Sequence, residues 1–135
     1  MMTLFEKIVL GEIPAYKIAE TDNCLAFLDA FPLKEGHVLV IPKKPINYIF
    51  DLNDDMTISL HLFTKKVAQA MKEVIDCNRI GMAVIGLEVP HTHIHLVPLD
   101  QIDDINFSKP KIKLSDERMQ EIACSIQRVF TSLHS

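Results

Sequence analysis

Three histidines alternate with other residues along positions 91–96 of the chain. Side chains of a β-strand point alternately to its two faces. If this segment is extended, His91, His93 and His95 project from one face, and the residues between them project from the other. The chain has 6 histidines in its 135 residues, so half of them lie in this segment. Because imidazole titrates near neutral pH, the row indicates a chemical site on one face of a strand whose other face is apolar.

The spacing of apolar residues predicts the other elements of the chain. A short helix is expected over 3–10, and a long helix is expected from Asn53 or Asp54 to about Asp76. A third helix should begin at Ser115. Besides the histidine segment, strands are expected over 16–19, 25–28, 37–41 and 81–85. Short turns between neighbouring strands favour an α+β fold, with an antiparallel sheet of five strands and helices packed on it.

Size and composition favour a single domain over 1–135. The net charge of −4 and a pI near 5.8 argue against a nucleic-acid-binding surface, which needs clustered lysine and arginine. No apolar run approaches the roughly 18–20 residues that cross a bilayer, and the first residues do not resemble a signal peptide. Three cysteines, an odd number without paired spacing, predict buried, reduced thiols and a cytoplasmic protein.

Three interpretations of the histidine row compete. The imidazoles could be structural groups on a half-exposed strand. They could instead bind a metal ion, since imidazole is a common ligand of zinc, copper and iron. Two consecutive His-X-His steps, however, separate the outer Cα atoms by about 13 Å, which is too far for one ion to gather all three rings easily. Further ligands in a mononuclear metal hydrolase could come from His37 or Glu88.

The third interpretation is nucleophilic catalysis at phosphorus. Neutral imidazole attacks well at neutral pH without a strong base to activate it, and water can hydrolyse the resulting phosphohistidine. Neighbouring histidines can donate protons and balance the charge of the phosphate oxygens. His37 begins an apolar strand directly after a loop, so its ring could lie beside the row. His61 and His134 fall on predicted helices and are not expected to take part.

The histidine segment resembles the signature of the histidine triad (HIT) family, in which three histidines alternate with apolar residues. Thr92 is a mild departure from that signature. Three more stretches match the family in order, and the resemblance covers roughly residues 3–98. They read Gly-Glu-Ile-Pro-Ala-Tyr-Lys from Gly11, Leu-Ala-Phe-Leu-Asp-Ala-Phe-Pro from Leu25, and Gly-His-Val-Leu-Val-Ile-Pro-Lys-Lys-Pro from Gly36.

The resemblance implies a five-stranded α+β fold, usually a homodimer, that hydrolyses or transfers the α-phosphate of purine nucleotide derivatives. Substrates of the family include phosphoramidates, acyl adenylates and dinucleoside polyphosphates. The resemblance makes His93 the nucleophile and His91, His95 and His37 its supporting histidines. It makes Asp29 the acceptor of the ribose hydroxyls. The apolar residues around the base would be Phe5, Ile8 and Phe27. No metal is required for the covalent step, although magnesium could accompany polyphosphate substrates. A non-catalytic nucleotide-binding protein remains the alternative.

Two stretches depart from the family. Many bacterial relatives have a Cys-X-X-Cys near the N-terminus that helps to hold structural zinc, but residues 3–6 read Thr-Leu-Phe-Glu, so no zinc is expected there. The turn before the histidines is short, and Glu88 stands where relatives have a hydroxyl that contacts phosphate. Because phosphate repels a carboxylate, we expect Glu88 to turn away or to meet a cationic part of the substrate. The sequence assigns no role to residues 101–113.

Overall fold

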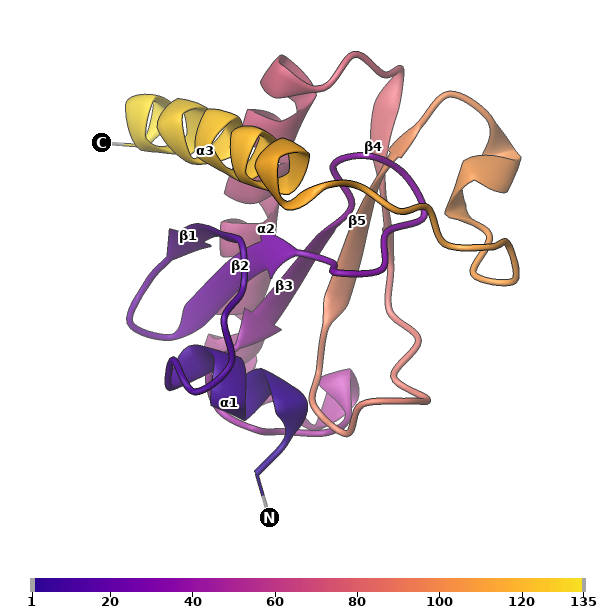
Figure 1. The fold of residues 1–135 in the computed structure, drawn as a ribbon. Helices are drawn as coiled ribbons and strands as arrows, with labels where there is room; N and C mark the ends of the chain where they lie inside the picture. Colours follow the sequence, from indigo (N-terminus) through magenta and orange to yellow (C-terminus); the bar gives the residue numbers. More distant parts are fainter. Residues whose placement is uncertain (1, 135) are drawn as a thin grey trace.

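A computed structural model describes residues 2–134 as one sheet with three α-helices (Figure 1). Its elements in chain order are α1 (Leu4–Val9), β1 (Lys17–Glu20), β2 (Cys24–Leu28), β3 (Val38–Pro42), α2 (Asp54–Val74), β4 (Arg79–Ala83), β5 (Ile94–Leu99) and α3 (Asp116–Leu133). Short 3₁₀ helices cover Ile49–Asp51 and Ile102–Ile105. Asn53 and Ser115 cap α2 and α3, as the sequence predicts, by accepting hydrogen bonds from backbone amides of the first turn.

The five strands have the order β1-β2-β3-β5-β4, and every neighbouring pair is antiparallel. The predicted α+β fold is therefore confirmed. The first three strands begin and end within one residue of the expectation. β4, however, begins and ends two residues earlier than predicted, and β5 begins only at Ile94. Of the three alternating histidines, only His95 thus lies in the strand, while His91 and His93 lie in the preceding loop.

The register of the central strands places the site on one face of the sheet. In β2 and β3 every residue is buried, which indicates a sheet covered on both faces. Phe27 is paired with Leu39, and Leu39 with His95. Residues paired across antiparallel strands share a face, so these three side chains lie together. Ile94 belongs to the core on the other face, so this part of the predicted alternation is confirmed.

Helices α2 and α3 form the main hydrophobic core with the opposite face of the sheet. In Figure 1, α2 lies behind the sheet and α3 runs along its upper end. Leu60 and Val67 of α2 and Ile126 of α3 are fully buried in this core. Their spacing follows the apolar stripe that predicts both helices. This main core contains none of the predicted site residues, and it supports the strand that carries His95.

The short helix α1 covers part of the face that carries the histidines. Thr3 begins it with a capping box, in which Thr3 and Glu6 satisfy each other's backbone amides. Phe5 and Ile8 of α1 are buried in a second, smaller cluster. The strand residues of this cluster are Leu25, Phe27, Leu39 and Ile41. A six-residue helix is marginal by itself, so packing on the sheet must stabilise it.

Two features of the surface bear on the expectations from composition. Among residues 2–134, no helix combines the length and the apolar character needed to cross a membrane. The thiols of Cys24 and Cys77 are free and buried, as expected, but Cys124 is exposed on α3. The expectation of burial is wrong for Cys124 because it lies outside the inner stripe of that helix.

Gly36 permits the sharp turn that places His37 directly before β3. Its φ is +90°, and a Cβ added there would overlap Ile75, lying 3.2 Å from its Cγ1. Gly11 has a similar φ of +79° but open space around it. We expect Gly36→Ala to lower the free energy of unfolding by about 2–4 kcal/mol, and Gly11→Ala by about 1 kcal/mol. Urea unfolding measures both, and equal losses would show that Ile75 moves aside without cost.

Candidate active site

The imidazole rings form a continuous row with two phenylalanines. The ring centroid of His93 lies 5.0 Å from that of His95 and 5.0 Å from that of Phe5. At the other end of the row, His95 lies 4.6 Å from Phe107. These edge-to-face distances are within the range of favourable aromatic contacts. The structure therefore brings the predicted histidines together, although only one of them is on a strand.

The hydrogen bonds of His93 determine which of its nitrogens is free. Its Nδ1 lies 2.7 Å from the backbone carbonyl oxygen of His91. A carbonyl can only accept, so Nδ1 of the neutral ring carries the proton and donates it. Nε2 then keeps its lone pair. This is the tautomer that a nucleophilic imidazole requires.

His91 is held in the opposite tautomer by two partners. Its Nε2 donates to the carbonyl oxygen of Pro42 at 2.7 Å, and its Nδ1 accepts from the Thr3 hydroxyl at 2.8 Å. The ring is fully buried, and burial lowers its pKa. With both nitrogens engaged, His91 has no free atom for chemistry. Its role is to fix the loop whose carbonyl orients His93.

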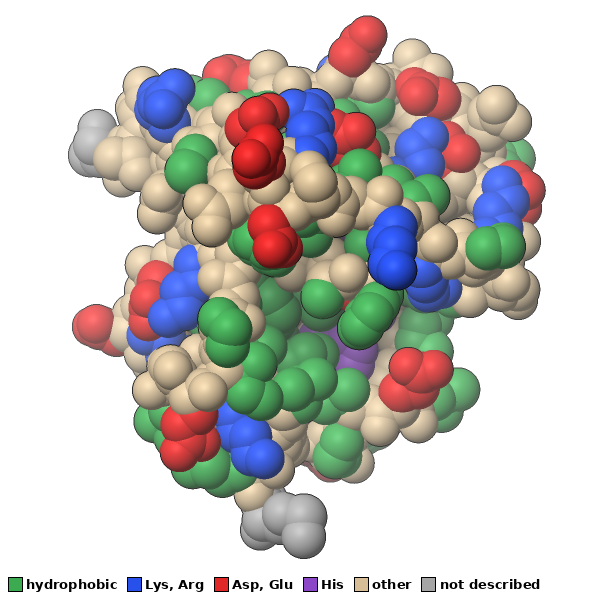
Figure 2. Space-filling model, in the orientation of Figure 1, with side chains coloured by type: hydrophobic (Ala, Val, Ile, Leu, Met, Phe, Trp, Pro, Cys, Tyr) green, Lys and Arg blue, Asp and Glu red, His purple; other side chains and the backbone are tan. Residues whose placement is uncertain are grey.

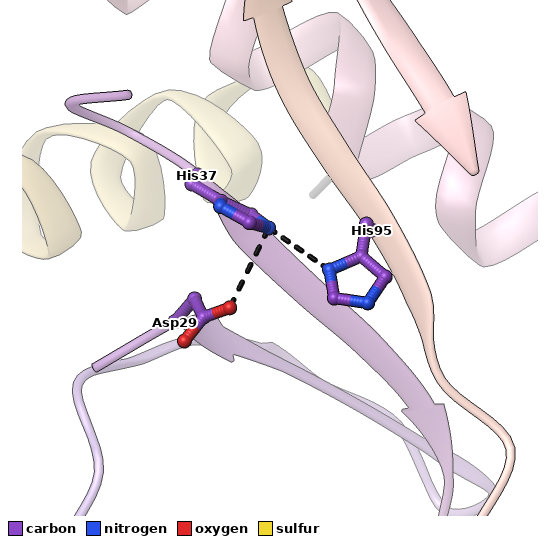
Figure 3. A group of neighbouring side chains, drawn as sticks. All are labelled: Asp29, His37 and His95. Atoms are coloured by element: carbon purple, nitrogen blue, oxygen red, sulfur yellow. Dashed lines mark hydrogen bonds and ion pairs between the residues drawn. The ribbon is translucent and has the colours of Figure 1, made fainter. Parts of the chain in front are cut away.

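His37 and His95 form a directional pair (Figure 3). The Leu33 amide donates to Nδ1 of His37 at 3.0 Å, so the proton of His37 is on Nε2. That Nε2 lies 3.0 Å from Nδ1 of His95, to which it donates. The proton of His95 is consequently on its own Nε2. One backbone amide thus sets the tautomers of two histidines in sequence, and His95 has a donor left over.

Asp29 lies beside this pair, with Oδ2 3.5 Å from His37 Nε2. Burial lowers the pKa of His37 to about 3, so the ring is neutral at neutral pH and the contact is no ion pair. The other carboxylate oxygen accepts a hydrogen bond from the Phe31 amide at 2.9 Å. Burial raises the pKa of Asp29 above its usual value. The partly exposed carboxylate can still accept hydrogen bonds from a ligand.

The pKa values of the pair follow from the surroundings. The exposed fractions of His37 and His95 are 1% and 8%. Desolvation is the main cause that lowers the pKa of His95 to about 4, and the charges of His93 and Lys111 add to it. Both rings therefore remain neutral in the whole range in which most proteins work. A neutral His95 can donate through Nε2 while it accepts through Nδ1.

An apolar cluster lies at the other end of the row. Phe5 and Phe27 contact each other edge to face with centroids 5.7 Å apart, and Ile8 belongs to the same cluster. The predicted base-binding residues are thus together and next to His93. Val89 packs against this cluster as well. Sequence reasoning missed Val89, because the alternation signal does not extend into the loop before His91.

Two further side chains that the sequence did not single out lie at the site, and both come from residues 101–113. Phe107 packs against His95 and lies 6.3 Å from His37. The charge of Lys111 lowers the pKa values of Asp29, His37 and His95. An irregular segment has no periodicity that would indicate which of its side chains face the rest of the protein, so no sequence signal marks these residues.

The site opens to solvent in a hollow of the surface (Figure 2). Histidine is visible at the bottom of this hollow, with hydrophobic side chains along one side and charged side chains around the rest of the rim. A separate cavity of about 600 Å³ lies between the β1–β2 turn and the start of α2. Its lining, which includes Lys43 and Asp55, is distinct from the histidines. The chemistry is therefore concentrated in the hollow.

The structure groups possible metal ligands differently from the sequence interpretation. Among residues 2–134, the set that could surround one ion is Asp29, His37 and His95, with ligand atoms within 4.8 Å of one another. The row itself and Glu88 do not form such a set. To bind a metal through Nε2, neutral His37 would need its proton on Nδ1, where the Leu33 amide also points a proton. This donor set therefore fits a metal ion poorly.

Comparisons with known proteins agree with the geometry. A family model described as the HIT domain matches residues 10–102. A HIT-like protein of Borreliella burgdorferi is 34% identical over 131 residues, which cover 91% of this chain and 94% of the relative. The adenosine 5'-monophosphoramidase hnt1 of Schizosaccharomyces pombe is 37% identical over 99 residues, covering 73% and 74%. The crystal structure of a Hit-like protein from Bartonella henselae superimposes with a TM-score of 0.81 at 26% identity, covering 94% and 95%.

Because the histidine pair is buried in its neutral form, folding should weaken in acid. An unfolded histidine titrates near 6.5, above the folded pKa values of about 3 for His37 and about 4 for His95. Between these values the unfolded chain binds more protons, so the free energy of unfolding falls as the pH drops below about 6.5. We expect a loss of roughly 2–4 kcal/mol between pH 7 and pH 5 in urea titrations. The double variant His37→Asn, His95→Asn should lose less, and an equal slope would contradict the assignment.

Proposed function

The chain belongs to the histidine triad (HIT) family, and we propose that it hydrolyses or transfers the nucleotidyl group of purine nucleotide derivatives. The reaction takes place at the α-phosphate and passes through a bond between phosphorus and His93. Phosphoramidates, acyl adenylates and dinucleoside polyphosphates are the candidate substrates. The name of the relative from Schizosaccharomyces pombe, an adenosine 5'-monophosphoramidase, supports the first of these classes.

The observation that carries this proposal is the hydrogen bond from His93 Nδ1 to the His91 carbonyl. It leaves the Nε2 lone pair free to attack phosphorus. As the new N–P bond forms, the bond from phosphorus to the leaving group breaks, and the leaving group departs with the electron pair. The ring becomes an N-phosphoryl imidazolium that keeps its Nδ1 proton. The carbonyl dipole stabilises this positive charge where it develops.

His95 donates a hydrogen bond to the departing group through its Nε2–H, because its Nδ1 already accepts from His37. This hydrogen bond stabilises the negative charge that the leaving group carries away, and the released group takes its proton from solvent. Water then attacks the phosphohistidine and loses a proton to solvent, and the N–P bond breaks to release the nucleotide and neutral His93. His37 acts through His95, so it is a positioning residue. Its own tautomer depends on the Leu33 amide.

The nucleoside has a place beside the nucleophile. The apolar cluster of Phe5, Ile8 and Phe27 offers a surface for a planar base, and Phe5 contacts the ring of His93. Asp29, in the loop that follows β2, can accept hydrogen bonds from two ribose hydroxyls through its two oxygens. These assignments rest on the family resemblance and on the proximity of the residues. The base would thus lie at the α1 end of the row.

No metal takes part in the covalent step of this proposal. The directional hydrogen bonds of His37 and His95 support that view, because a metal on Nε2 of His37 would oppose the Leu33 amide. Magnesium could still accompany a polyphosphate substrate by neutralising its charge. In that case it enters with the substrate and not as a resident of the histidine site.

Substitution of the nucleophile tests the mechanism. His93→Ala should lower the release of AMP from adenosine 5'-phosphoramidate by about a thousandfold or more, because no other free imidazole lone pair lies at the site. Mass spectrometry of acid-quenched native protein should find one AMP unit attached to His93. The matched control is His61→Ala, which removes an exposed histidine of α2 and should leave the rate unchanged.

A chelator separates the alternatives. Under the proposal, AMP release continues in excess chelator. Activity that disappears with chelator and returns with zinc would contradict it in favour of a metal hydrolase. Nucleotide binding without any AMP release would identify a non-catalytic nucleotide-binding protein.

We also propose that the protein is a homodimer, as the family resemblance implies. The edge strand β4 supports this, because Met82 is exposed to 55% and Ile85, just beyond the strand, to 50%. On α2, which packs against β4, Ile58 and Leu62 are exposed as well. An open strand edge with apolar side chains favours pairing with a second chain.

Light scattering at micromolar concentration should therefore give the mass of two chains. Met82→Lys places a charge on the open edge and should shift the protein towards one chain, since burying an unpaired charge in an interface is costly. Arg128→Glu, a change of charge at an exposed site of α3, serves as the control. A monomeric native protein would contradict the dimer.

A further inference from the structure

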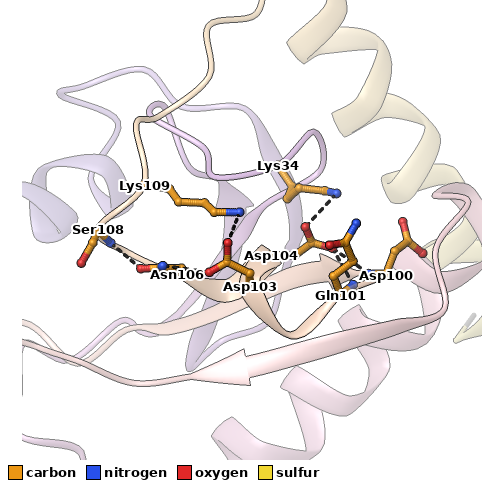
Figure 4. Close-up of polar contacts among 8 residues, drawn as sticks. All are labelled: Lys34, Asp100, Gln101, Asp103, Asp104, Asn106, Ser108 and Lys109. Atoms are coloured by element: carbon orange, nitrogen blue, oxygen red, sulfur yellow. Dashed lines mark hydrogen bonds and ion pairs between the residues drawn. The ribbon is translucent and has the colours of Figure 1, made fainter.

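The segment after β5 is folded into a rigid loop by its own polar groups (Figure 4). One carboxylate oxygen of Asp104 accepts hydrogen bonds from the amides of Asp100 and Gln101, at 2.8 and 2.9 Å. The other lies 3.5 Å from the ammonium group of Lys34, in the loop before β3. Asp103 pairs with Lys109 at 2.6 Å. The loop is therefore attached both to itself and to the segment that carries Asp29 and His37.

The same loop extends over the histidine pair. The amide of Ile112 donates to the Pro32 carbonyl at 2.9 Å, which holds this part of the chain against the loop that follows Asp29. The ring of Phe107 lies against His95. These two contacts place residue 111 next to the mouth of the site.

Lys111 differs from Lys34 and Lys109 in its partners. Its ammonium group donates to the Phe107 carbonyl at 3.0 Å and lies 5.7 Å from the centre of the Phe107 ring. Within residues 2–134 it has no carboxylate at ion-pair distance, whereas Lys34 and Lys109 are both paired. Two of the three ammonium protons therefore remain free for a ligand. The side chain is held in place without being neutralised.

The order of the aromatic row places this charge away from the base. Phe5 lies on one side of His93, and His95, Phe107 and Lys111 follow on the other. A substrate with its base against Phe5 and its phosphorus at His93 would direct the group beyond phosphorus towards Lys111. The ribose hydroxyls are neutral and gain little from an ammonium group, whereas a leaving group can carry full charge.

We propose that Lys111 is a specificity-determining residue that binds the leaving group and favours anionic leaving groups over neutral amines. This inference rests on the proposed function. Negative charge grows on the leaving group as its bond to phosphorus breaks, and a fixed ammonium group stabilises that charge. Glu88, in the loop before His91, raises the pKa of Asp29, whereas the charge of Lys111 lowers it, so the two side chains bring opposite charges to this end of the site.

Two substrates with the same nucleoside and α-phosphate test the proposal. Adenosine 5'-phosphosulfate releases sulfate, and adenosine 5'-phosphoramidate releases ammonia. We expect Lys111→Gln to lower the ratio of their kcat/KM values, sulfate over amine, by about three- to tenfold, the range for one charge-assisted contact that is partly screened by water. Added salt should reduce the ratio of the native enzyme in the same direction. Lys111→Arg, which keeps the charge, should retain most of it.

Lys113→Gln is the matched control. It removes the same charge two residues further along an exposed stretch, and the Lys113 charge is not among those acting on Asp29, His37 or His95. Its ratio should equal that of the native enzyme. An unchanged ratio in Lys111→Gln, including equal losses on both substrates, would overturn the assignment. Failure of the native enzyme to release AMP from either substrate would instead refute the proposed function.

Discussion

The hydrogen bond between the His93 ring and the carbonyl of His91 determines the chemistry available to this protein. The proton of a neutral imidazole can sit on either ring nitrogen. The hydrogen-bond partner of one nitrogen therefore determines whether the other nitrogen carries a proton or a lone pair. Here a backbone carbonyl keeps the proton on Nδ1, so Nε2 remains a base and a nucleophile. The carbonyl is itself held in place because His91 is bonded to Pro42 and Thr3. A single backbone dipole thus depends on contacts from β3 and from the start of α1.

In the pair of His37 and His95, a backbone amide instead of a carbonyl determines which nitrogen carries the proton. A backbone amide from Leu33 keeps the His37 proton on Nε2, and this proton in turn keeps the His95 proton on its outer nitrogen. Burial reinforces the arrangement by making both rings neutral. The site therefore places a lone pair and a hydrogen-bond donor side by side at neutral pH. A charged ring at either position would remove one of these functions.

The loop after β5 gives the site its outer wall. Phe107 shields the His95 ring from solvent, which strengthens the electrostatic interactions beneath it. Lys111 brings positive charge to a site whose other nearby charges, Asp29 and Glu88, are negative. The nucleotide substrates that we propose are anionic, so this lysine would offset a repulsion that the two carboxylates otherwise impose. In that proposal, the chemistry at phosphorus and the selection among leaving groups come from separate parts of the chain.

The sequence by itself predicted the helices, the strands and an antiparallel sheet with helices packed on it, because apolar periodicity reports which faces are buried. It also predicted that the histidines lie together with His37, Asp29, Phe5 and Phe27, since the pattern of a known family placed them. It misjudged the start of β5, because alternation of residue types does not reveal where backbone pairing begins. Only the tertiary structure decided the tautomers and the contribution of Phe107 and Lys111. Those features depend on contacts between residues far apart in the chain, and an irregular loop carries no periodic signal of what it touches.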